Sequence, residues 1–227
     1  MLMKRMRLYL IPLCGSLLCA AFSNHANALL RPSSVLQQSG AIKAPRNERL
    51  REELLRMRDD DQAARQRWTA DKLGEKSAHE VIALDEKHTT RLRAIFKEHG
   101  FPGVSLVGKD GAEAAHTLLL HSPSLDLKKE GLVHLEVAAK RGEVPMWAVA
   151  GLTDKILTAE GKPQLYGMNF DLIDGELVLN LKKVVDPARL EERRAKAGLP
   201  PLAEYVKGLE EMYKVHAVIL NEQLLKP

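Results

Sequence analysis

The chain has 227 residues, of which 34 are basic and 30 acidic, for a formal net charge of +4. Three of the basic residues, Lys4, Arg5 and Arg7, stand at the extreme N-terminus without any acid nearby. Without them the balance is close to neutral, which gives no indication of a nucleic-acid-binding protein, since such a protein needs a clustered basic face. The length suffices for one domain with a sizeable core.

Residues 1–28 have the pattern of a secretory signal peptide. The basic start leads into the apolar run Leu8–Phe22, which is shorter than the ~20 residues of a typical membrane span. Ala26-Asn27-Ala28 supplies the small-x-small pattern of a cleavage site. We therefore predict cleavage after Ala28 and a periplasmic or secreted mature protein with no stable membrane span.

Both cysteines of the chain, Cys14 and Cys19, lie in this leader. Each follows a leucine, whereas the cut of a lipoprotein normally follows a small residue, so lipidation at Cys19 is the less favoured alternative. Cleavage leaves a mature chain without cysteine. This excludes a thiol nucleophile and a disulfide, although export would permit one.

Beyond the leader, residues 29–45 contain two prolines and a glycine without a helical period, which predicts a flexible linker. A helical domain is predicted over 46–215. Apolar residues at spacings of three and four indicate its helices. These cover about 50–68, 77–98, 112–120, 128–141 and 145–160.

After Pro163 the residue pattern changes from helical to strand-like. β-branched and aromatic residues flank Asp174-Gly175, which predicts one hairpin over about 164–182. A charged helix begins at Asp186-Pro187, and a last apolar stripe over 202–224 predicts a long amphipathic helix that ends within 216–227. Its face offers a homodimer interface. The fold class is mainly α: a single helical domain with one small β-hairpin near the C-terminal end.

Several polar residues fall where the helical period predicts burial. A buried ionised carboxylate costs several kcal/mol unless it is paired, so such groups should converge on one another or on a basic partner. Arg65 and Arg91 are the candidate partners. The inward polar residues are Asp61, Asp85, His88, His121 and Asp154.

Metal binding is an alternative interpretation of this pattern. Asp85 and His88, and likewise Glu113 and His116, have the i, i+3 spacing of carboxylate-bridged metal sites in helical bundles. Glu113 and His116, however, share a polar helix face with Thr117, which indicates solvent exposure. We predict no metal and no cofactor.

The order of these motifs resembles a widespread bacterial family of domains of unknown function, over Leu50–Tyr205. The signature of that family is H-A-D, then D-R, then P-Q-x-Y-G-T-Q. The corresponding segments here are His121-Ser122-Pro123, Asp154-Lys155 and Pro163–Asn169. The chain departs from the signature in all three segments, and the resemblance implies no reaction.

Two functions stay open. As a cell-envelope or extracellular hydrolase, the chain would use His121 as general acid or base, with Asp85 or Asp154 orienting it. As a non-catalytic binding or interaction protein, it would use the same polar residues to fix helix register, and its partner would be a protein or a small-molecule ligand. The departures from the signature favour the second. The substrate-binding residues of the first would be Gln164, Tyr166, Asp61, Arg65 and Arg91.

Overall fold

The computed structural model describes residues 46–71 and 74–225. The predicted signal peptide, its cleavage site and the linker over 29–45 lie outside the described residues. The contacts divide the chain into two compact units, one ending at Val149 and the other beginning at Ala150, whereas the sequence predicted a single domain over 46–215. Each unit is considered by itself.

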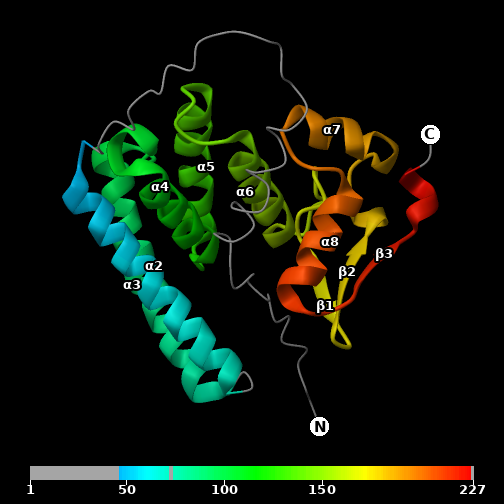
Figure 1. Ribbon diagram of the computed structural model, residues 1–227, viewed down its shortest axis with the longest axis horizontal. Coiled ribbons are helices and arrows are strands. Elements are labelled where there is room, and N and C mark those ends of the chain that lie inside the picture. Colours follow the sequence, from blue (N-terminus) through cyan, green and yellow to red (C-terminus); the bar gives the residue numbers. More distant parts are fainter. Residues whose placement is uncertain (1–45, 72–73, 226–227) are drawn as a thin grey trace, which may run out of the picture. The chain divides into compact units, whose positions relative to one another are not determined.

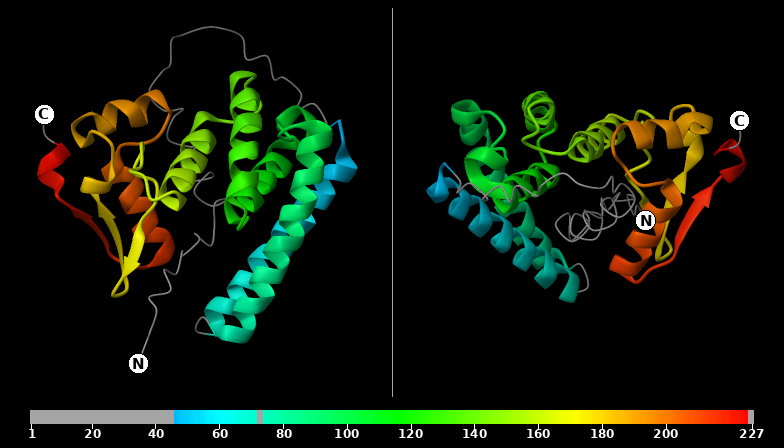
Figure 2. Two further views of the ribbon diagram at one scale, coloured as in Figure 1. Left: turned by 180° about the vertical axis from the view of Figure 1, so that it is seen from behind. Right: turned by 45° about the horizontal axis from the view of Figure 1, so that its top comes forward.

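The first unit is helical and contains the first four predicted helices and the start of the fifth. Helices α2 (Glu48–Ala70) and α3 (Glu75–His99) run side by side (Figure 1, Figure 2), and α2 also packs on α4 (Val104–His121). Helix α5 (Leu125–Lys140) and the start of α6 (Met146–Ala159) complete the unit. The fully buried side chains that form its core include Leu54, Leu92, Ile95, Leu118, Leu119, Leu127 and Leu135.

Local sequence explains where several of these helices begin and how closely they pack. The Asn47 side chain accepts a hydrogen bond from the Leu50 amide and starts α2, and Ser124 caps α5 through the Leu127 amide. This cap places the start of α5 three residues before the predicted Lys128. On α5, a Cβ at Gly131 would lie 2.6 Å from Leu119 Cδ2, so only glycine allows α5 this close to α4.

The second unit combines helices with a small sheet. Strands β1 (Asp171–Ile173) and β2 (Glu176–Asn180) form the predicted hairpin, with Ile173 opposite Glu176. Asp174 and Gly175 both have positive φ, as a tight two-residue turn requires. The other elements are α7 (Leu190–Lys196), α8 (Leu202–Tyr213), β3 (Ala217–Leu220) and the short 3₁₀ helices η1 (Leu181–Lys183), η2 (Pro187–Arg189) and η3 (Glu222–Leu225). The fold is mainly α, as predicted.

The long C-terminal helix predicted over 202–224 is wrong. Helix α8 ends at Tyr213, and Lys214 adopts a left-handed conformation that turns the chain. The following apolar segment forms β3, which pairs with β2 in parallel, with Val218 opposite Val178. Pairing with an open strand edge overrides the local helical period. The continuous helical face suggested for a homodimer is therefore not formed.

Among the described residues, no helix combines the length and apolar character needed to cross a membrane.

Candidate functional site

Four ionisable side chains from three helices meet in the interior of the helical unit. Asp61 and Arg65 lie one turn apart on α2, Asp85 on α3, and His121 at the end of α4. Their exposed fractions are 1, 2, 8 and 4 %, respectively. Helical periodicity predicted that Asp61, Asp85 and His121 point inward, with Arg65 as a candidate partner, and the structure brings the four into contact. We call them the buried charge cluster.

Arg65 is the centre of the buried charge cluster. Its Nε donates to Asp61 Oδ1 at 3.0 Å, and its Nη2 donates to Asp85 Oδ1 at 2.6 Å. One guanidinium thus bridges two carboxylates from different helices, which its fork of donors allows and a lysine ammonium would not reproduce. The third nitrogen, Nη1, has no hydrogen-bond partner among the described residues.

Asp61 also orients the His121 ring. His121 Nδ1 lies 2.8 Å from Asp61 Oδ2 and 3.1 Å from Arg65 Nε. An ionised carboxylate only accepts hydrogen bonds and a guanidinium only donates them, so Nδ1 donates to Asp61 when it carries a proton and accepts from Arg65 Nε when it does not. In the neutral tautomer with the proton on Nδ1, the ring has its lone pair on Nε2, the orientation that a general base requires.

The two carboxylates of the buried charge cluster differ in pKa. Burial pushes the pKa of Asp61 upward, but its hydrogen bond with His121 and the charges of His121 and Arg65 outweigh burial and lower it. Burial raises the pKa of Asp85 to about 6, and Arg65 offsets only part of this effect. Asp85 is therefore the carboxyl of the cluster that exchanges a proton in the mildly acidic range.

Replacement of Asp85 by asparagine is expected to flatten the pH dependence of stability between about pH 4 and 6. The folded protein keeps the Asp85 proton up to about pH 6, whereas the unfolded chain releases it near the ordinary value of 3.8. Stability from this group therefore falls as pH rises through that window, by on the order of 3 kcal/mol. Urea unfolding at several pH values measures the slope. The exposed neighbour variant Glu86→Gln should leave it unchanged, and an unchanged slope in Asp85→Asn would contradict the assignment.

Arg91, the other predicted partner, does not join the buried charge cluster. Its Nη2 donates to Glu53 Oε2 at 2.8 Å, and its side chain is 40 % exposed. The pair links α3 to α2 at the surface. His88 is buried one turn beyond Asp85, and burial lowers its pKa.

In the second unit, Asp154 and Gln164 hold the loop 164–169. Asp154 is fully buried and accepts the backbone N–H groups of Leu165 at 2.7 Å, Tyr166 at 3.1 Å and Met168 at 2.9 Å. Burial raises the pKa of Asp154, and these amides offset part of the rise. The Gln164 side chain donates to the Asn169 carbonyl and accepts from its amide, both at 2.8 Å. Tyr166 enters this arrangement through its backbone.

Sequence reasoning missed Arg194, which is fully buried in the second unit. Its Nη1 donates to the Tyr166 carbonyl at 2.6 Å, its Nε donates to the Pro200 carbonyl at 2.9 Å, and its guanidinium lies 5.1 Å from the centre of the Tyr205 ring. Burial lowers the pKa of Arg194 and raises that of Tyr205 to about 12. A short charged helix gives no sign of such burial.

The predicted site residues thus form two groups. Asp61, Arg65, Asp85 and His121 lie together in the helical unit, and Asp154, Gln164 and Tyr166 lie together in the second unit.

The chain matches a family of unknown function, DUF6624, over residues 48–218. It belongs to this family. The match confirms the resemblance to a domain of unknown function, while the three-part signature stays a prediction. No curated protein and no solved structure matches the chain.

In this DUF6624 member the Glu113–His116 pair does not lie as expected. His116 is only 6 % exposed, because Trp147 and Ala148 at the start of α6 cover it. Its Nε2 lies 3.1 Å from the Ala148 carbonyl, and burial lowers its pKa to about 4. Over residues 46–71 and 74–225, no three His, Cys, Asp or Glu side chains are grouped as ligands of one metal ion.

Proposed function

We propose that this DUF6624 member is an exported protein with a non-catalytic binding or interaction role, in which the buried charge cluster is a scaffold. The observation that carries the proposal is that both carboxylates of the cluster are paired within it. Each carboxylate has its positive partner inside it, and none of the four residues is more than 8 % exposed. A buried network in which both carboxylates are paired specifies which helix faces pack together and in which register.

The contacts of Asp154 and Gln164 support the same proposal. Both oxygens of Asp154 accept backbone N–H groups, and both ends of the Gln164 amide pair with Asn169. A carboxylate with three such contacts has little capacity left to orient a catalytic histidine. The export part of the proposal rests on the leader 1–28 alone.

The second candidate is a hydrolase, and one observation favours it. Asp61 holds His121 in the tautomer of a general base, and Asp85, with its pKa of about 6, would supply an acid for near-neutral conditions. In this alternative, Arg65 Nη1, which has no hydrogen-bond partner within 46–71 and 74–225, would stabilise negative charge that develops on a substrate.

His121→Ala separates the two candidates. As a scaffold residue, His121 should be dispensable for chemistry, while its loss removes one donor to Asp61 and costs about 1–3 kcal/mol of stability. Urea unfolding and turnover of chromogenic esters, phosphoesters and glycosides are measured on the parent and the variant. We expect a lower unfolding midpoint and no turnover that depends on His121.

The matched control is His216→Ala, which removes an exposed histidine paired with Glu210 at 2.9 Å. It should change neither measurement by a comparable amount. A turnover that falls by about 100-fold or more in His121→Ala, and not in the control, would overturn the binding proposal in favour of the hydrolase.

A further inference from the structure

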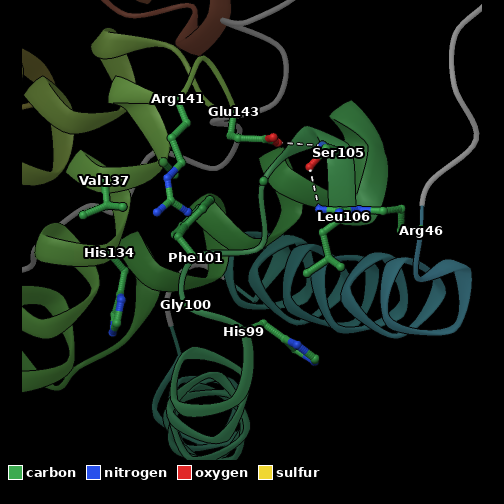
Figure 3. Close-up of a pocket in the computed structure, with 12 residues that line it drawn as sticks. Arg46, His99, Gly100, Phe101, Ser105, Leu106, His134, Val137, Arg141 and Glu143 are labelled. Atoms are coloured by element: carbon green, nitrogen blue, oxygen red, sulfur yellow. Dashed lines mark hydrogen bonds between the residues drawn. The ribbon is translucent and has the colours of Figure 1, made fainter.

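A pocket of about 250 Å³ opens on the helical unit, where α3 ends, α4 begins and α5 ends (Figure 3). None of the four residues of the buried charge cluster lines this pocket. The lining side chains that matter for its chemistry are Arg46, Phe101, His134, Val137, Arg141 and Glu143.

The charge of this pocket is unbalanced. It has two guanidinium groups and one carboxylate. The carboxylate, on Glu143, turns away to accept the Ser105 backbone N–H at 2.7 Å, as Figure 3 shows. Arg46 donates to the neutral Ser105 hydroxyl at 3.1 Å, so neither arginine is bound to Glu143.

Arg141 is the cation of the pocket that is available to a ligand. Its side chain extends toward Phe101 from the side on which Val137 and His134 lie (Figure 3). Across the described part of the chain, it makes no side-chain hydrogen bond or ion pair. The acids on the neighbouring helices have other partners: Glu98 lies 3.3 Å from His99, and Glu130 lies 2.9 Å from Arg93.

Apolar surface adjoins this guanidinium. Val137, one turn before Arg141 on α5, lines the pocket and is 43 % exposed. Phe101 and Leu106 add apolar lining. A cation beside exposed apolar side chains fits a ligand that carries both a negative group and a hydrocarbon part.

We infer that this pocket binds a small organic anion, with its carboxylate or phosphate group on Arg141 and its apolar part against Phe101 and Val137. A guanidinium presents paired donors that match either group. The inference deepens the proposed function, on which it rests, by giving the binding protein a class of ligand.

Four probes test the inference on the purified protein: benzoate, phenyl phosphate, acetate and inorganic phosphate. Binding is followed by calorimetry and by NMR shifts of the Val137 methyl groups. We expect the two aromatic probes to bind more tightly than their small counterparts, and the stronger aromatic probe to identify the preferred anionic group. Arg141→Gln should weaken binding by about tenfold or more.

The matched control is Lys140→Gln, which removes the exposed positive charge at the last residue of α5. Lys140→Gln should change the affinity for the probes by no more than about twofold, because the anion is held by direct contact with Arg141 and not by the overall positive charge near the helix end. Equal losses in Lys140→Gln and Arg141→Gln would overturn the inference, as would the lack of saturable binding of every probe up to about 10 mM. The proposed function fails separately, through turnover that depends on His121.

Discussion

Replacement of Arg65 by methionine is expected to destabilise the helical unit by about 3–5 kcal/mol. Methionine keeps much of the side-chain volume but leaves Asp61 and Asp85 buried without the cation they share. Removal of one partner from a buried ion pair costs more than the pair contributes, because the remaining charge has lost both water and its partner. Urea unfolding followed by circular dichroism measures the change.

Arg67→Met is the matched control for this experiment. Arg67 lies on the same helix, but its side chain is 61 % exposed and 3.9 Å from Glu80. Such a surface pair contributes at most about 1 kcal/mol.

Adding Asp61→Asn and Asp85→Asn to Arg65→Met should recover most of the lost stability, since no uncompensated carboxylate remains. If Arg65→Met costs no more than Arg67→Met, Arg65 does not hold the cluster together.

Replacement of Asp154 by alanine is expected to cost about 3 kcal/mol and to loosen the loop 164–169. Three backbone N–H groups, of Leu165, Tyr166 and Met168, lose their shared acceptor at once. The loop residues are only half-buried, so water replaces part of the loss. Hydrogen exchange should show these three amides exchanging at least about tenfold faster, since a 1.4 kcal/mol change is a factor of ten.

Two variants bracket this result. Asp154→Asn keeps one acceptor oxygen but turns an NH₂ group toward backbone donors, so it should fall between the parent and Asp154→Ala. Asp171→Ala removes an exposed acid of β1 that pairs with Lys183 at 3.1 Å, and should leave the three amides protected. Unchanged exchange in Asp154→Ala would mean that the loop is held by Gln164 and Arg194 alone.

The helices and the inward direction of the cluster residues were predictable because both depend on local period. Apolar residues three and four apart define one face of a helix, and a polar residue on that face must be buried wherever the face is. Asp61, Asp85 and His121 were identified in this way before any contact was known. The Asp174-Gly175 turn is equally local, because its conformation follows from the two residues themselves.

The choice of partners was not predictable. In the sequence, Arg65 and Arg91 were equivalent candidates for the partner of the buried carboxylates. In the structure, Arg91 pairs with Glu53 at the surface, while Arg65 on α2 pairs with Asp85 on α3. Strand β3 depends on the open edge of β2, nearly 40 positions earlier in the chain. Arg194 is buried because the 164–169 loop and Tyr205 cover it, which nothing in its own charged helix indicates.

The sequence by itself therefore indicated the family, the mainly helical class and the inward positions of Asp61, Asp85, His121 and Asp154. Tertiary structure alone decided which charges pair, which loop Asp154 holds, that Arg194 is buried and that Arg141 stands beside the exposed Val137. The physical reason is range. Periodicity and turn chemistry act within a few residues, whereas the partner of a buried charge is set by whichever distant segment packs against it.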